Sequence, residues 1–191
     1  MNMNIQTLTV GPVATCCYIL SEDIASSECL VVDPGAEPDR IRKACGPMRI
    51  AAILLTHGHF DHIGAVSALM DENTRLLIHP LDAPMLSDPD LNVSRLMIRQ
   101  PVTAPQPTDL VNEGDHLSLA GLEIEVLHTP GHTPGGVCYR IGNDLFTGDT
   151  LFDHGWGRTD LPGGDEHALF ASLRRIMPIA REIPFHPGHG A

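Results

Sequence analysis

Positive charge is scarce in this sequence of 191 residues. Lysine and arginine together number 12 against 24 aspartates and glutamates, the formal net charge is −12, and Lys43 is the one lysine. A surface of this kind repels a polyanion, so nucleic acid is a poor candidate partner. No apolar run approaches the length of a membrane span, and no basic segment followed by an apolar run opens the chain. We therefore expect a soluble, cytoplasmic protein that does not act at a membrane.

Cysteines with the CxxC spacing are also missing. The five cysteines are odd in number, and most stand in apolar contexts such as "CCYIL" and "ECLVV". Because thiols in such contexts are typical of buried, reduced side chains, we expect neither disulfides nor thiolate metal ligands. These residues are Cys16, Cys17, Cys29, Cys45 and Cys138.

Short apolar runs of strand length alternate with helical patterns along the chain. Hydrophobic residues make up 42% of the sequence, enough for residues 1–191 to form one domain with a buried core. Strands followed by a helix, roughly twice over, favour an α/β sandwich with sheets inside and helices outside. Residues 87–110 contain four prolines and predict a long surface excursion. The pattern predicts strands at 5–10, 17–20, 29–35, 49–56, 75–80, 116–131, 135–141, 144–149 and 182–190, and helices at 37–45, 63–73 and 165–177.

The segment "THGHFDH" crowds three histidines and an aspartate into six positions directly after an apolar run. His57 and His59 point the same way when the backbone between them is extended or looped, and Asp61 and His62 follow as the next helix begins. One turn thus offers two nitrogen ligands to one ion, and an oxygen and a nitrogen to a neighbouring ion. A helix start capped by Asp61 among solvated histidines is the alternative.

Three further candidate ligands each follow an apolar run, namely His132, Asp149 and His189. Ligands at strand ends are held by a rigid scaffold, as a pre-organised metal site requires. Imidazoles and carboxylates suit zinc, iron or manganese, and we favour zinc.

With "HTPGHTPG", "FTGD" and "PGHG", this cluster resembles the metallo-β-lactamase superfamily over nearly the whole chain from "VVDPG" onward. Within it, "GDTLF" followed by "GRTDLPGGD" resembles the small glyoxalase II-like hydrolases, the hydroxyacylglutathione hydrolase type. The resemblance implies a four-layer αββα sandwich with two divalent metal ions in a cleft at the edge of the sheets. It implies a first metal on His57, His59 and His132, a second on Asp61, His62 and His189, and Asp149 bridging the two.

The resemblance predicts a metallohydrolase, most specifically a thioesterase acting on a glutathione thioester through a hydroxide that bridges the metals. Asp149 would fix the metal separation and Asp61 would orient the water, so these two are the candidate catalytic residues. A thioester suits this chemistry because its thiolate leaves without a strong general acid. The alternatives are a mononuclear iron persulfide dioxygenase, a lactone hydrolase and a non-catalytic metal-binding module, and the oligomeric state stays open.

The sequence departs from the family pattern in two places. Full-length glyoxalase II continues into a helical C-terminal domain with basic residues that hold glutathione, whereas this sequence ends two residues after His189. We therefore expect a single metallo-β-lactamase-like domain without that helical domain. In "DHGWG", where relatives more often carry small residues, we expect Trp156 and His154 to alter the wall of the pocket.

Weaker candidates surround these ligands. Asp33 either orients a ligand or forms a turn before Pro34. We expect Arg158 to pair with Asp160 rather than bind substrate. Arg95 and Arg99 are expected on a solvated face rather than on an anionic substrate, and Thr56 and Thr129 either support ligand segments or merely cap and pack. Structural or surface roles are expected for His79, His116, His128, His154, His167 and His186, with His154 the first exception.

Overall fold

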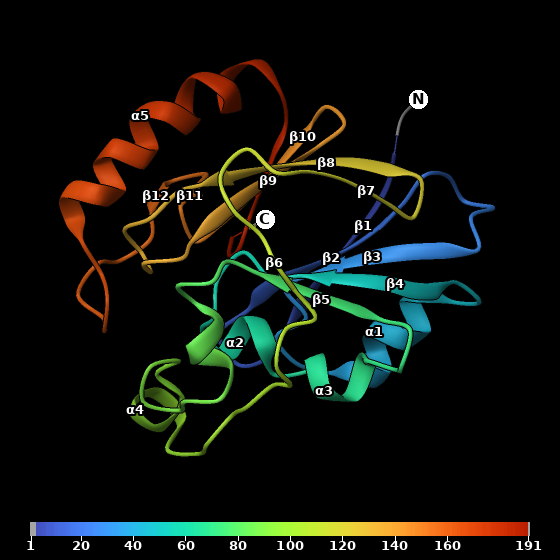
Figure 1. Ribbon diagram of the computed structural model, residues 1–191, viewed down its shortest axis with the longest axis horizontal. Coiled ribbons are helices and arrows are strands. Elements are labelled where there is room, and N and C mark those ends of the chain that lie inside the picture. Colours follow the sequence, from blue (N-terminus) through green and yellow to red (C-terminus); the bar gives the residue numbers. More distant parts are fainter. Residues whose placement is uncertain (1–2, 191) are drawn as a thin grey trace.

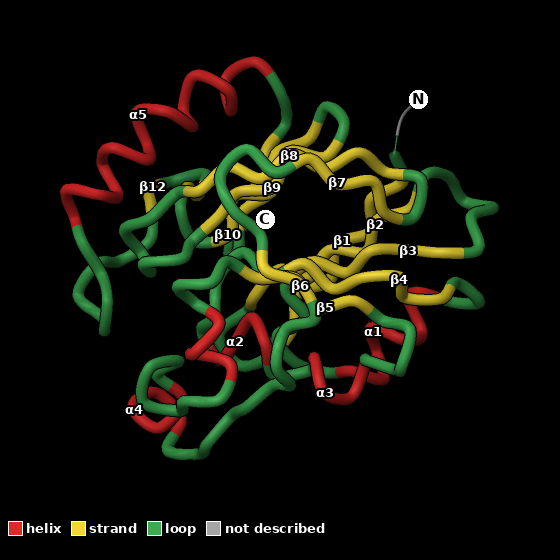
Figure 2. Tube along the Cα trace, viewed as in Figure 1, coloured by secondary structure: helices red, strands yellow, loops and turns green. Residues whose placement is uncertain are grey.

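Two β-sheets lie face to face in the middle of the molecule, and helices cover both outer faces (Figures 1 and 2). The computed structural model describes residues 3–190. The strand order is β1-β2-β3-β4-β5-β6 in the first sheet and β13-β10-β9-β8-β7 in the second. The first sheet comprises β1 (Asn4–Val10), β2 (Thr15–Ser21), β3 (Glu28–Val32), β4 (Arg49–Leu54), β5 (Arg75–Ile78) and β6 (Asp109–Leu110). The second comprises β7 (His116–Leu119), β8 (Leu122–His128), β9 (Val137–Ile141), β10 (Asp144–Gly148) and β13 (Phe185–Pro187).

The inner strands of the first sheet, β2 to β5, are buried on both faces. Alternate residues of β2 enter different layers: Cys17 and Ile19 pack toward the helices, whereas Tyr18 and Leu20 pack between the two sheets. Because both faces are covered, such a strand is apolar along its whole length instead of alternating with polar residues. The antiparallel pairs β1-β2 and β2-β3 are followed by the parallel pairs β3-β4, β4-β5 and β5-β6.

Helices close the sandwich from outside. Side chains such as Ile41 of α1, Ile63 of α2 and Val66 of α3 complete the core on the first sheet, and Ile176 of α5 packs on the second. The four-layer αββα sandwich predicted from the sequence is therefore confirmed. The helices are α1 (Pro38–Cys45), α2 (Phe60–Ile63), α3 (Val66–Leu69), the 3₁₀ turn η1 (Ala83–Leu86), α4 (Ser94–Ile98) and α5 (Glu166–Glu182), and a small ribbon joins β11 (Leu151–Phe152) to β12 (Gly155–Trp156).

The single helix predicted at 63–73 is wrong. The chain forms two one-turn helices, α2 and α3, because the Ala65 amide donates to the carbonyl of Pro34 (2.9 Å) and not to a carbonyl of its own helix. Gly35, in the same turn as Pro34, lies so close to the Asp61 carbonyl that a side chain at this glycine would overlap it. A tertiary contact thus overrides the local helical pattern.

Other predicted boundaries also differ, and the strand predicted at 116–131 is the antiparallel pair β7 and β8. Helix α5 continues to Glu182 through Pro178, because packing of Ile176 and Ile179 on the second sheet compensates for the amide hydrogen bond that proline cannot make. The excursion at 87–110 is not wholly on the surface. It contains α4, ends in strand β6, and is held by the buried Asn92, whose amide donates to the carbonyls of Met85 and Val102 (2.9 Å each).

All five cysteines are buried and unpaired, as the apolar contexts predict. Among residues 3–190, no helix combines the length and the apolar character that crossing a bilayer requires.

The core of the first sheet offers a test of this packing. Replacing Ile53, which is fully buried, by alanine leaves a cavity between β4 and the helices, so we expect the free energy of unfolding to fall by about 2–5 kcal/mol in urea denaturation. Ile24→Ala is the matched control, because Ile24 is 90% exposed and its truncation should change stability by less than about 0.5 kcal/mol. Equal effects of the two substitutions would contradict the assigned core.

Candidate metal centre

The fold brings all seven predicted ligands to one edge of the sandwich. His57 and His59 follow β4, Asp149 follows β10 and His189 follows β13, and β10 and β13 are parallel neighbours, so these two strands end at the same edge of the second sheet. His132 lies in the loop between β8 and β9. Asp61 and His62 belong to α2, directly after the first two histidines. Segments that follow strand ends, four loops and the first turn of α2, therefore supply every member of the cluster.

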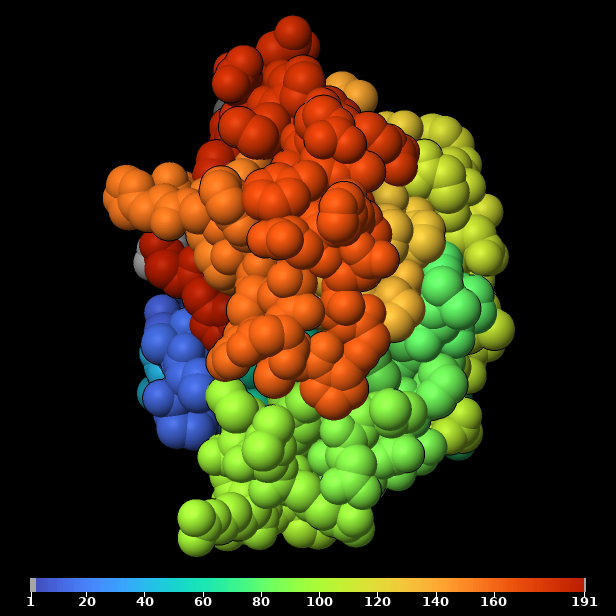
Figure 3. Space-filling view, turned by 90° about the vertical axis from the view of Figure 1, so that its left-hand side faces the viewer, coloured from blue at the N-terminus to red at the C-terminus, as the bar shows by residue number. Residues whose placement is uncertain are grey.

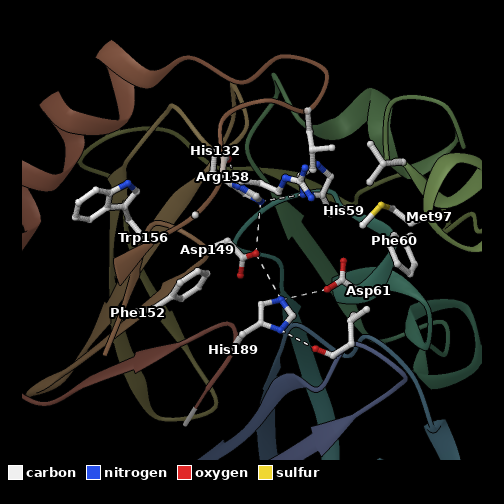
Figure 4. Close-up of a pocket in the computed structure, with 14 residues that line it drawn as sticks. His59, Phe60, Asp61, Met97, His132, Asp149, Phe152, Trp156, Arg158 and His189 are labelled. Carbon is white, nitrogen blue, oxygen red and sulfur yellow. Dashed lines mark hydrogen bonds and ion pairs between the residues drawn. The ribbon is translucent and has the colours of Figure 1, made fainter. Parts of the chain in front are cut away.

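The seven side chains form two groups joined by one carboxylate. The candidate ligand atoms of His57, His59 and His132 lie within 4.8 Å of one another, as do those of Asp61, His62 and His189. Asp149 lies between the groups. Figure 4 shows it with His59 and His132 on one side and Asp61 and His189 on the other. Its Oδ2 is 3.5 Å from both His132 Nε2 and His189 Nε2, and its Oδ1 is 3.4 Å from His62 Nε2.

Several polar atoms of the cluster are buried without a hydrogen-bond partner. They are Nε2 of His57 and His59, both ring nitrogens of His62, and Oδ1 of Asp149. An unsatisfied buried polar atom costs about 1–3 kcal/mol, so five of them in one place need an explanation. Nitrogen and carboxylate oxygen are suitable donors for zinc, iron or manganese. The donor set therefore fits divalent cations.

Three of the five imidazoles are held by the protein through their outer nitrogens. His132 Nδ1 lies 2.7 Å from the Arg158 carbonyl, and His189 Nδ1 lies 3.1 Å from the Val13 carbonyl. His57 Nδ1 lies 3.1 Å from the Thr56 hydroxyl. Such contacts fix the tautomer and the ring orientation, and leave the second nitrogen of each ring for the centre of the cluster.

Asp33 acts through other side chains. Its Oδ1 accepts the Thr56 amide (2.8 Å), and its Oδ2 accepts the Thr56 hydroxyl (2.6 Å) and lies 2.9 Å from His62 Nδ1. Asp33, His57 and His62 also satisfy the distance criterion for a metal group. However, both oxygens of Asp33 are already occupied by the protein, so its place is to orient Thr56 and His62. This outcome favours the positioning role over the simple turn.

Burial and neighbouring charges shift the histidine pKa values in opposite directions in the two groups. Burial lowers the pKa of His57, and burial together with neighbouring His132 lowers the pKa of His59 to about 3, so both stay neutral, the state in which imidazole binds a metal. Burial alone would lower the pKa of His62, but Asp61, Asp33 and Asp149 outweigh it and raise that pKa to about 9. These carboxylates attract any cation placed among them.

Asp82 is a buried carboxylate that the sequence pattern did not single out. Its Oδ2 accepts the Gly58 amide (3.1 Å) and the Thr133 hydroxyl (2.7 Å), and its Oδ1 accepts the Gly135 amide (2.6 Å). Gly58 separates His57 from His59, and Thr133 follows His132, so one side chain ties together the two loops of the first group. An aspartate before Ala-Pro has the appearance of a turn former, and no local signal marks its partners 24 to 53 residues away.

A cavity of about 340 Å³ opens onto the cluster. Figure 3 shows the face on which the N-terminal strands (blue), the segment around residue 95 (green), the segment around residue 155 (orange) and the C-terminal segment (red) meet around a narrow hollow. Trp156 lines this cavity, as expected, but His154 is exposed and does not. Arg158 pairs with Asp160 through two hydrogen bonds of 2.6 and 2.7 Å, which confirms the predicted pairing.

The other histidines have structural or surface positions, as predicted. The ring of His79 stacks on that of His128 with centroids 4.1 Å apart, and His186 Nε2 lies 2.8 Å from Asp144 Oδ1. The remaining three, His116, His154 and His167, are exposed.

The chain belongs to the metallo-beta-lactamase superfamily, whose family model matches residues 10–177. It is 37% identical over 198 residues to the probable metallo-hydrolase YqgX of Bacillus subtilis, covering 98% of this chain and 90% of that protein. It is 32% identical over 207 residues to the hydroxyacylglutathione hydrolase GloC of Haemophilus influenzae, covering 99% and 92%. The structure is similar to that of TTHA1623 in a di-iron-bound form, with a TM-score of 0.84, 36% identity, and coverage of 97% and 92%. Membership of this superfamily indicates a hydrolase that uses divalent metals.

Removing the Asp82 carboxylate should loosen the first group of ligands. Asp82→Ala leaves two amides and a hydroxyl without an acceptor, so we expect a loss of about 2–5 kcal/mol in the free energy of unfolding and a lower metal content per chain. Urea denaturation and elemental analysis measure the two effects. Asp90→Ala is the control, since the Asp90 carboxylate is 68% exposed and pairs only with exposed Arg95. Unchanged stability and metal content in Asp82→Ala would contradict this role.

Proposed function

We propose that the cluster binds two divalent cations and that the protein hydrolyses thioesters. In this proposal His57, His59 and His132 hold the first cation, Asp61, His62 and His189 hold the second, and Asp149 bridges them. The observation that carries the proposal is the convergence of buried nitrogen and oxygen atoms that have no hydrogen-bond partner. We favour zinc, and the di-iron form of TTHA1623 makes iron a second candidate.

When bound, such a pair of cations supplies Lewis acidity that polarises a carbonyl group and lowers the pKa of water toward neutrality. The protein's own groups place the reactants. Asp61 lines the cavity, and the Thr15 hydroxyl donates to its Oδ2 (2.9 Å), which fixes the carboxylate so that it can accept a hydrogen bond from the attacking water. Asp149 holds the two halves of the cluster at a constant separation.

The cavity favours a substrate with a good leaving group. Among the described residues that line it, every polar side chain except Arg158 belongs to the cluster. No separate general acid is therefore placed to protonate a leaving amine or alkoxide. A thiolate leaves without such help, which supports a thioester over an amide. The relative GloC is named a hydroxyacylglutathione hydrolase, which is a thioesterase, and this supports the same reaction class here.

The second group of ligands supports the hydrolase over its alternatives. A mononuclear iron dioxygenase would leave Asp61, His62 and His189 without a metal to bind, although the fold assembles them around buried, unpartnered His62 Nε2. A lactone places the same kind of carbonyl in the same cavity, so lactones belong in the assay. The decisive experiment is metal quantification combined with turnover of S-lactoylglutathione, simple thioesters and lactones. Metal-loaded protein that leaves all thioesters intact would refute the proposal.

Substituting a ligand of the first group and the bridging carboxylate tests the assignment. We expect His59→Ala and Asp149→Ala each to reduce kcat/KM for thioesters by more than about 100-fold, because loss of a group that only orients a ligand already costs roughly 10- to 100-fold. Circular dichroism should show that the fold persists. His154→Ala should retain full activity, because His154 is exposed and does not line the cavity. Undiminished turnover in both ligand variants would remove the basis of the mechanism.

Metal removal should affect both stability and activity. A cation that binds only the folded chain stabilises it by about 2.7 kcal/mol at 100 times its Kd, so dialysis against a chelator should lower Tm as well as abolish turnover. Adding zinc, iron or manganese back should restore both. A chelated protein with an unchanged Tm and undiminished turnover would show that the cluster does not depend on metal.

A further inference from the structure

The rim of the cavity is apolar and comes from separate segments of the chain. Val13 lies in the turn between β1 and β2, Met97 in α4, Phe152 in β11 and Trp156 in β12. Figure 4 shows Met97 on one side of the cluster and Phe152 and Trp156 on the other. Val13, Met97 and Trp156 are 40%, 47% and 52% exposed. Exposed apolar side chains gathered around a cavity are characteristic of a binding site.

These walls are supported from behind. The Trp156 ring makes an edge-to-face contact with Phe170 of α5, with centroids 5.4 Å apart, and Phe152 makes a similar contact with the His189 ring at 6.1 Å. Phe60 and Val93, which also line the cavity, are buried. Packing of this kind keeps the aromatic surfaces in place next to the cluster.

The same cavity offers almost nothing to an anionic substrate. Within residues 3–190, Arg158 is the one lysine or arginine that lines it, and the Nε–Nη2 edge of its guanidinium is already bound to Asp160. Helix α4 presents Met97 to the cavity, whereas Arg95 of the same helix pairs with Asp90 (2.9 Å) outside it. The two carboxylates of a glutathione group would therefore find no unpaired cation among the lining residues.

We propose that the natural substrate is a thioester with an apolar group beside the reacting carbonyl, and that Val13, Met97, Phe152 and Trp156 bind this group. The inference rests on the proposed thioesterase function. The apolar group belongs either to the acyl part or to the thiol part, and both would be recognised by burial of hydrocarbon. Each methylene that leaves water strengthens binding about fourfold.

Trp156 provides a direct reporter, because it is the one tryptophan of the chain and lines the rim. Metal-loaded protein is titrated with non-hydrolysable thioethers while its fluorescence is followed. The series comprises S-methyl-, S-butyl- and S-hexyl-N-acetylcysteamine, which are neutral, together with S-methyl- and S-hexylglutathione, which carry the same alkyl groups on a charged thiol. We expect the hexyl thioether of N-acetylcysteamine to bind roughly tenfold or more tightly than the methyl one. S-hexylglutathione should bind no more tightly than its neutral counterpart.

Variants locate the binding surface. Met97→Ser should reduce the preference for hexyl over methyl by about fourfold or more, because it replaces apolar surface at the rim. Ile24→Ser is the matched control, since Ile24 is 90% exposed and does not line the cavity, and its preference should stay that of the parent protein. For Trp156→Ser, which removes the reporter, the preference is measured as turnover of hexanoyl- against acetyl-N-acetylcysteamine.

Turnover also assigns the apolar group to one part of the substrate. Faster hydrolysis of hexanoyl-N-acetylcysteamine than of S-hexyl thioacetate places the group on the acyl part, and the reverse order places it on the thiol part. Equal binding of methyl and hexyl thioethers, or tighter binding of both glutathione thioethers than of the neutral ones, would overturn the inference. A rising binding series without any turnover would support the apolar site and would count against thioester hydrolysis alone.

Discussion

Desolvation of the histidine and aspartate cluster is the constraint on which the rest of this structure depends. Removing imidazoles and carboxylates from water is unfavourable unless each polar atom finds a partner. Nδ1 of His57, His132 and His189 find theirs in the protein, while His57 Nε2 and Asp149 Oδ1 are buried without hydrogen bonds. A divalent cation can satisfy nitrogen and carboxylate oxygen at once. The cluster is thus a site whose chemistry suits cations.

The two sheets are tied together where this cluster forms. Tyr18 of the first sheet donates to the carbonyl of Pro187 in β13 of the second (2.6 Å), and Tyr139 of the second sheet donates to the carbonyl of Leu55, directly after β4 (2.9 Å). Both tyrosines are buried in the layer between the sheets. These reciprocal bonds fix the distance between the loops that carry the ligands. Asp82 adds a third link within the first group, so the scaffold holds the loops that carry these histidines.

Much of this arrangement could be predicted from the sequence. The predictable features are those that neighbouring residues encode. Strand β4 is apolar after Arg49, and the type and spacing of the residues that follow it indicate metal ligands. By contrast, the break between α2 and α3 depends on the Pro34 carbonyl, which is distant in sequence from Ala65. Asp82 is a similar case, because its partners lie in loops that only the folded chain brings together. Local patterns carry no information about such contacts.

The metal ligands and the cavity walls come from different parts of the fold, so similarity to relatives bears on them differently. Six of the seven candidate ligands lie within residues 10–177, which the family model matches, whereas His189 lies beyond them. Family membership therefore bears on most of the cluster. The cavity walls come instead from the β1-β2 turn, helix α4 and the β11-β12 ribbon, which lie outside the two main sheets or at their edges. Side chains in such segments can change without disturbing the metal ligands. A hydroxyacylglutathione hydrolase among the relatives therefore bears more on the reaction of this protein than on its substrate, and in our proposal the apolar walls select the substrate.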